Sequence, residues 1–374
     1  MPFRQDWLLD LTISPHKLAL GAFGVNCSGA LSATLIPERW DGSWESNLAL
    51  ARLAEDAGLD FMLPLGRWRG YGGKTDHNGS SFETLTWAAG LLAATRRIKV
   101  FGTVHVTLFH PVLAAKQMAT VDHIGGGRFG LNIVCGWYED EFNMFGIDPG
   151  ESSARRYDEG DEWLEIVTRI WNENAPFDYQ GDFFKLKGVK GDPKPLQRPR
   201  PPVLNAGYSP RGRRFAMEHA DIMFTSVVDV ETSAVELRKL KQDITAGGRD
   251  VGIYTTAFVV CRPTRREAEE FYHWYAVENA DEGAVENMLR GRGYFDRGLA
   301  PDAIARLRKR IAGGNGGYPI IGSPDDVAAE MQKLNSLGID GIAMGLVNGL
   351  LYLPYVRDEV LPRLARLGLR EEAS

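Results

Sequence analysis

The chain has 374 residues, 44% of them hydrophobic and 25% charged, which is ordinary for a globular protein with a sizeable core. Its net charge of −6 comes from interspersed acidic and basic residues, so no basic tract favours nucleic acid. No apolar run approaches the ~18 residues of a membrane span. We therefore expect a cytoplasmic protein without a nucleic-acid or membrane partner.

Apolar runs alternate with amphipathic segments along most of the chain. In one such segment Leu50, Leu53, Ala54 and Ala57 share a helical face that Gly58 can end. Further helices are predicted at 82–92, 111–124, 156–171, 212–219 and 323–334, the first of them opened by a capping box of Ser80 and Glu83. Buried strands are predicted at 18–25, 61–65, 98–106, 129–135, 202–207, 222–227, 254–261 and 339–346.

Repeated βα units indicate parallel strands with right-handed crossovers. The chain is longer than the roughly 250 residues of a simple β/α barrel, so we interpret residues 1–374 as one (β/α)8 TIM barrel with insertions. Two stretches depart from the repeat. Residues 178–186 resemble a small hairpin, and residues 277–319, rich in Gly and Arg, predict a partly helical, mobile insertion over the strand ends.

Several motifs are excluded by their spacing. Residues 70–75 contain glycines and a Lys-Thr pair, but Trp68 stands where a phosphate loop needs Gly, and Thr75 ends any GxGxxG pattern. The cysteines Cys27, Cys135 and Cys261 lack CxxC spacing or a nearby His, so we expect reduced thiols and no metal site.

One polar residue lies inside an otherwise apolar predicted strand. Asn132 is a satisfied core amide or a functional group, because a buried amide without partners costs a few kcal/mol. Cys135, Gly136 and Trp137 follow it, and this combination suits a planar ligand, since Gly permits close approach and Trp offers a flat wall.

Acid-base groups give a weaker signal. His77, His105 and His110 show no triad spacing, and His110 before Pro111 is equally a helix cap. If the protein is an enzyme, a cofactor supplies the difficult chemistry. Residues 205–213 couple a strand end to a helix start, where Ser209 and Arg211 either bind an anion or act as a cap and a solvated cation.

Taken together, these segments resemble the bacterial luciferase-like flavin-dependent monooxygenases, in the branch of pyrimidine and dimethylsulfone monooxygenases. The resemblance covers essentially the whole chain. Its motifs are residues 69–75, Ala114-Ala115-Lys116-Gln117 with Asp122, residues 126–137, and Gly181-Asp182-Phe183-Phe184.

The resemblance implies a cofactor and its neighbours. Reduced FMN would come from a separate NAD(P)H-dependent flavin reductase, with O2 as co-substrate. Thr103 and Asn132 would be catalytic residues beside the flavin and oxygen. Cofactor contacts would come from these two residues together with Leu63, Trp137, Tyr157, Gly207 and Ser209.

The resemblance also suggests a reaction, the cleavage of a carbon–heteroatom bond in a small organosulfur compound or nitrogen heterocycle, pyrimidine-like or flavin-derived. Candidate substrate contacts are Trp40, Arg67, Trp68, His105 and Tyr138. Two alternatives stay open, a deazaflavin-dependent oxidoreductase on the same barrel and a non-catalytic flavin-binding protein. By analogy with the family we expect a homodimer or homotetramer.

Overall fold

The computed structural model describes residues 14–136, 139–148 and 153–371. At its centre parallel strands close into a barrel in the order β1–β2–β3–β4–β7–β8–β9–β11, and β11 pairs with β1 again. The strands are β1 (Ala19–Phe23), β2 (Phe61–Leu63), β3 (Lys99–His105), β4 (Phe129–Val134), β7 (Val203–Asn205), β8 (Ile222–Thr225), β9 (Gly252–Cys261) and β11 (Gly341–Gly345). The predicted (β/α)8 barrel is confirmed.

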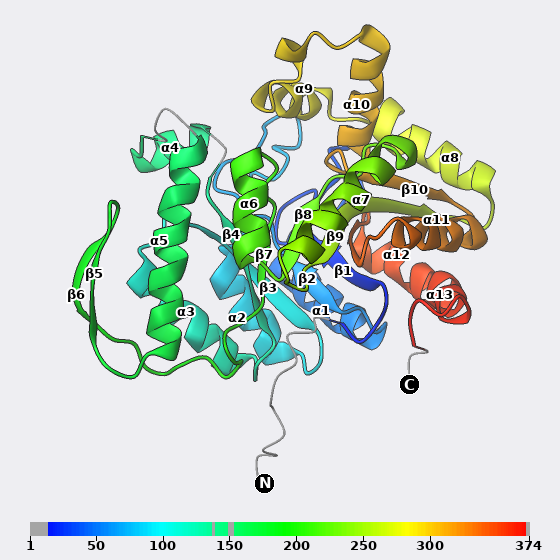
Figure 1. Cartoon of the computed structure of the whole chain (residues 1–374). Coiled ribbons are helices and arrows are strands. Elements are labelled where there is room, and N and C mark those ends of the chain that lie inside the picture. The colour runs from blue at the N-terminus through cyan, green and yellow to red at the C-terminus, as the bar shows by residue number, and fades with distance from the viewer. Residues whose placement is uncertain (1–13, 137–138, 149–152, 372–374) are drawn as a thin grey trace.

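Helices surround this barrel (Figure 1). The longer ones are α1 (Trp44–Asp56), α2 (Thr84–Ala94), α3 (Pro111–Ile124), α5 (Ser153–Asn172), α6 (Pro210–His219), α7 (Val230–Ala246), α8 (Arg265–His273) and α11 (Pro324–Ser336). Shorter helices are α4 (Glu139–Phe145), α12 (Gly349–Tyr355) and α13 (Leu361–Arg366).

Helix ends follow the expected chemistry with one exception. Ser323 opens α11 with a capping box, His110 caps α3, and Gly58 after α1 has a φ of +76°. The predicted Ser80–Glu83 box is wrong. Glu83 is itself the N-cap of α2, and its carboxylate accepts hydrogen bonds from the Leu85 and Thr86 amides, which leaves no role for Ser80.

Apolar side chains fill the barrel interior and the layer between strands and helices. The interior cluster takes residues from nearly every barrel strand: Ala19, Phe61, Leu63, Phe101, Leu204, Ile222, Tyr254 and Ala343. The outer layer contains Leu131 and Ile133 of β4. Side chains alternate along a strand, so Asn132 faces the interior.

The two predicted departures from the repeat are present. β5 (Phe177–Gln180) and β6 (Lys185–Val189) form an antiparallel hairpin outside α5 (Figure 1). Residues 277–319 are largely helical, with η1 (Trp274–Glu278), α9 (Glu282–Gly291), η2 (Phe295–Arg297) and α10 (Pro301–Gly314). The end of that range begins a strand that the sequence reading missed, β10 (Tyr318–Gly322), which pairs with the last residues of β9.

The α9–α10 segment lies over the carboxyl ends of barrel strands. Ala280 forms a bridge with Thr34, Asn287 donates to the Tyr71 carbonyl at 2.8 Å, and Arg310 donates to the Val227 carbonyl at 3.0 Å. These partners follow β1, β2 and β8, at the end where β/α barrels place their chemistry. Within the described residues no helix has the length and apolar character needed to cross a bilayer.

Candidate active site

Thr103 and Asn132 lie side by side at the carboxyl ends of β3 and β4. They are register partners in the parallel ladder, and both are buried. Thr103 is two residues from Phe101, a member of the interior cluster, so both candidate side chains face the barrel axis.

A directed hydrogen-bond chain joins this pair. The Asn132 amide donates from Nδ2 to Thr103 Oγ1 at 3.0 Å, and the Thr103 hydroxyl donates to the Pro64 carbonyl at 2.9 Å. Asn132 Oδ1 is buried and has no hydrogen-bond partner. Because an unpaired buried acceptor costs about 1–3 kcal/mol, this oxygen is suited to accept a hydrogen bond from a bound ligand.

His105 extends the polar edge of β3. A Cβ added at Gly66 would lie 2.5 Å from His105 Cε1 and 2.8 Å from Thr103 Cγ2, so only glycine lets this backbone pass so closely. Burial, helped by the Arg67 guanidinium, lowers the pKa of His105 to about 4. The imidazole is therefore neutral at pH 7 and offers one donor and one acceptor.

Arg67 forms a buried ion pair with Glu141 of α4. Arg67 Nη1 lies 3.3 Å from Glu141 Oε1, and the side chains are 4% and 7% exposed. Glu141 also accepts from the Trp68 amide at 2.9 Å, and the Arg67 guanidinium packs 4.9 Å from the Tyr71 ring centre. Sequence reasoning missed Glu141, because Glu139-Asp140-Glu141 looks like a solvated acidic run.

The glycine-containing loop after β2 is held by Asp281, which precedes α9. Its carboxylate accepts from the Lys74 amide at 3.0 Å and from the Thr75 amide and hydroxyl at 2.7 Å. A Cβ at Gly73, where φ is +77°, would lie 2.3 Å from Asp281 Oδ1. The glycine run thus serves close packing, consistent with the absence of a phosphate-loop motif.

The start of α6 forms a second polar region. Ser209 caps the helix by accepting from the Gly212 amide at 3.1 Å. A Cβ at Gly212 would lie 2.5 Å from the Tyr157 hydroxyl oxygen, and one at Gly207 would lie 2.5 Å from the Gly212 carbonyl oxygen. The structure therefore brings Tyr157, Gly207 and Ser209 together around a helix N-terminus, a setting that favours anions.

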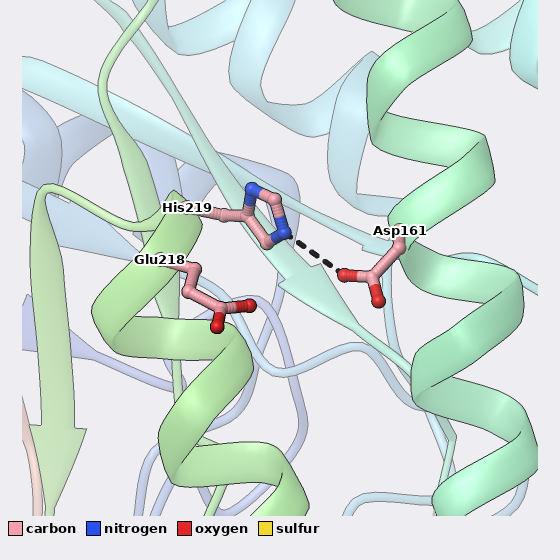
Figure 2. Close-up of side chains that lie close together, drawn as sticks. All are labelled: Asp161, Glu218 and His219. Carbon is pink, nitrogen blue, oxygen red and sulfur yellow. Dashed lines mark hydrogen bonds and ion pairs between the residues drawn. The ribbon is translucent and has the colours of Figure 1, made fainter.

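Arg211 is not available for that anion, because it pairs with Asp158 and Asp161 of α5. Asp161 also contacts His219 Nε2 at 2.9 Å, with Glu218 nearby (Figure 2). Among the described residues these three side chains have metal-ligand spacing, but the Asp161 carboxylate is already neutralised by Arg211. We interpret the group as a bridge between α5 and α6.

The remaining candidates are dispersed. Leu63 is buried in the interior cluster at the end of β2. Trp68 is half-buried against Phe145, and its indole nitrogen is buried without a hydrogen-bond partner. Trp40 lies in the outer core and donates to the Val25 carbonyl at 2.7 Å. Trp137 and Tyr138 lie outside the described residues.

Comparison with known families decides which proteins this chain is related to. Residues 22–341 match the model of the luciferase-like monooxygenases. The chain belongs to this family. All three cysteines of this luciferase-like chain are free and buried, and burial raises the pKa of the Cys27 thiol to about 12.

Two curated luciferase-like relatives cover nearly the whole chain. It is 31% identical over 357 residues to the FMNH2-dependent dimethylsulfone monooxygenase of Pseudomonas putida, covering 93% of this chain and 96% of the relative. It is 33% identical over 334 residues to the pyrimidine monooxygenase RutA of Enterobacter sp. strain 638, covering 87% and 91% respectively. This luciferase-like chain is accordingly a flavin-dependent monooxygenase.

The fold comparison agrees. The crystal structure of DmoA from Hyphomicrobium sulfonivorans superposes with a TM-score of 0.85 at 20% identity, over 95% of this chain and 89% of that one. At this identity the likeness establishes the luciferase-like barrel alone.

Proposed function

We propose that this enzyme is a two-component monooxygenase that receives reduced FMN from a separate NAD(P)H-dependent flavin reductase and uses O2 to oxygenate a small molecule. The substrate class is an organosulfur compound or a nitrogen heterocycle, pyrimidine-like or flavin-derived, in which a carbon–heteroatom bond is cleaved. The names of the dimethylsulfone and pyrimidine monooxygenases support this class.

The residues at the barrel mouth fit a flavin mononucleotide. Asn132 Oδ1 is a buried acceptor without a partner, which suits a ring N–H. Gly207 and Gly212 let the backbone before α6 pack closely against Tyr157, and the capped start of α6 suits the phosphate. Tyr157 and Ser209 lie at this helix start and would contact the phosphate, while Leu63 would supply an apolar wall and Trp137 remains a candidate contact.

Reduced FMN, when bound, supplies the electrons that activate dioxygen. Asn132 and Thr103 would orient the reacting groups, since the Thr103 proton is held on the Pro64 carbonyl and the Asn132 amide is fixed by Thr103. Fixed dipoles in a site without water stabilise developing charge without reorganisation. Neither side chain is a strong acid, so neither would protonate the activated oxygen prematurely.

Arg67, Trp68 and His105 are the proposed substrate contacts, with Tyr138 as a further candidate. Neutral His105 can both donate and accept, which suits an amide-like heterocycle edge, and Arg67 suits an electron-rich oxygen. Residues 277–319 would cover the site during turnover. Their mobility, the homodimeric or homotetrameric state and the cytoplasmic location stay predictions.

The observation that carries this proposal is the Thr103–Asn132 pair with its open Oδ1. Anaerobic titration should show tight binding of reduced FMN and weaker binding of a reduced deazaflavin. A substrate screen with labelled O2 should then place one labelled atom in a product. Preference for deazaflavin would favour the oxidoreductase alternative, and flavin binding without any oxygen-dependent product across the screen would favour a flavin-binding protein.

A further inference from the structure

A separate cavity lies between the loop after β1 and the glycine-containing loop after β2. Its volume is about 250 Å³. Its lining includes Gly29, Pro37, Arg39, Trp40, Asp41 and His77. None of these lining residues belongs to the Thr103–Asn132 pair or to the α6 region.

His77 is a buried lining residue of this cavity whose ring nitrogens lack hydrogen-bond partners. Its side chain is 1% exposed, and neither Nδ1 nor Nε2 has a hydrogen-bond partner. Burial outweighs the opposing effect of the Asp281 carboxylate and, together with the Arg292 and Arg67 charges, lowers the pKa of His77 to about 4. The ring is therefore neutral at pH 7 and carries one donor and one acceptor. Two unpaired buried polar atoms destabilise the folded protein unless the cavity holds a polar occupant.

The His77 ring is held firmly beside the cavity. It stacks on Tyr71, with ring centres 6.3 Å apart and planes inclined by 24°. A Cβ at Gly29, where φ is +76°, would lie 2.6 Å from His77 Nδ1, so that nitrogen faces another lining residue. The ring therefore has little freedom to turn toward a partner elsewhere.

The charges around the cavity favour an anion. Among its described neighbours, Arg39 donates one hydrogen bond, from Nη1 to the Ile36 carbonyl at 3.3 Å, although a guanidinium carries five N–H donors. The Asp41 carboxylate is already engaged by the Ser43 amide and by the Ser43 and Ser46 hydroxyls, at 3.0 to 3.1 Å. Arg39 is thus the charge with open hydrogen-bonding capacity.

The size and walls of the cavity suggest a flat ligand. A cavity of about 150 Å³ accommodates benzene, so this volume suffices for one ring with a polar substituent. Trp40 and Pro37 supply apolar surface, and Trp40 is fixed by its bond to the Val25 carbonyl. We propose that this cavity is a second small-molecule site, distinct from the flavin site, that binds a one-ring organic carboxylate through Arg39 and His77.

The test uses benzoate as the probe and the full-length protein without flavin, so its result is independent of the proposed reaction. Calorimetric titration should give saturable binding of benzoate, and uncharged benzamide should bind at least about tenfold more weakly. Arg39→Gln should weaken benzoate binding about tenfold, whereas Arg52→Gln, which removes an exposed charge from α1, should leave it unchanged.

Nitrogen-15 spectra of the histidine rings provide the second readout, because they report on His77 in the wild-type protein, and a variant is needed only to assign the signals. Benzoate should shift the His77 ring signals, which a His77→Asn variant identifies by their loss. Absence of binding at about 10 mM benzoate, equal affinity for benzamide, or an unchanged affinity in Arg39→Gln would overturn the proposal. Saturable binding with unmoved His77 signals would also overturn it.

Discussion

Two polar regions at the same end of the barrel differ in how completely their hydrogen bonds are satisfied. At the ends of β3 and β4, Asn132 keeps an unpartnered Oδ1 although it is buried. Nearby, Glu141 of α4 and Asp281 at the start of α9 are also buried, but each accepts bonds from backbone amides and lies against a charged or polar side chain.

This difference indicates that Asn132 has a different role from Glu141 and Asp281. A carboxylate whose oxygens accept hydrogen bonds holds together the segments that it joins, because breaking any of its contacts leaves a buried group unpaired. An amide with one engaged end and one open end is positioned and still able to bind. We therefore expect substitutions at Glu141 and Asp281 to change stability, and substitutions at Asn132 to change chemistry.

The largest expected stability effect is at Glu141. Glu141→Ala should lower the free energy of unfolding by about 3–5 kcal/mol, because it leaves the buried Arg67 charge without its carboxylate. The neighbouring Asp140→Ala is the control, since its ion pair with Arg69 spans 3.5 Å between side chains 46% and 57% exposed. That control should cost less than about 1 kcal/mol in denaturant unfolding. Equal losses of unfolding free energy in the two variants would contradict a structural role for the buried Glu141 pair.

Lowering the pH should destabilise the protein through two buried histidines, His77 and His105. Unfolded histidine titrates near pH 6.5, whereas burial lowers the pKa of His77 and of His105 to about 4. The unfolded state therefore binds more protons between these values, and stability present above pH 6.5 is lost as the pH falls toward 4, by about 3 kcal/mol per histidine.

Denaturant unfolding measured from pH 7 to pH 4.5 checks this expectation. His105→Gln should flatten the pH dependence, while the exposed His273→Gln should leave its slope unchanged. A wild-type stability that is constant over this range would contradict the burial of the two rings as neutral groups.

A smaller effect is expected where the loop meets Asp281. Gly73→Ala should cost about 2–3 kcal/mol, since its Cβ would add a clash with Asp281 to the strain of a positive φ. Gly188→Ala has a similar φ of +61° with nothing within 4 Å, so it should cost only about 1–2 kcal/mol. Comparable losses in thermal unfolding would show that close packing on Asp281 adds nothing.

The sequence predicted the barrel well, because buried parallel strands are apolar runs that local composition reveals. All eight barrel strands fall where expected, but β10 was missed, since Tyr318 and Pro319 follow glycines that indicate a loop. The position of Asn132 inside an apolar strand also singled out the residue on which the proposed site is centred.

Long-range contacts could not be predicted from the sequence. Asp281 lies more than 200 residues from Thr75, and Glu141 more than 70 from Arg67 and Trp68, so no local pattern links them. The sequence suggested Arg211 as an anion-binding candidate, yet α5 supplies Asp158 and Asp161 as its partners. The role of such charged residues depends on which helix packs beside them.

The most direct test of the account is a single-turnover reaction with reduced FMN, labelled O2 and a substrate identified by the screen. Asn132→Ala should lower labelled product per FMN about 100-fold and release the oxygen as hydrogen peroxide, while the Kd for reduced FMN changes by less than about threefold. The exposed Asn172→Ala should behave as wild type. Product formation by Asn132→Ala at the wild-type ratio would contradict a chemical role for the open amide.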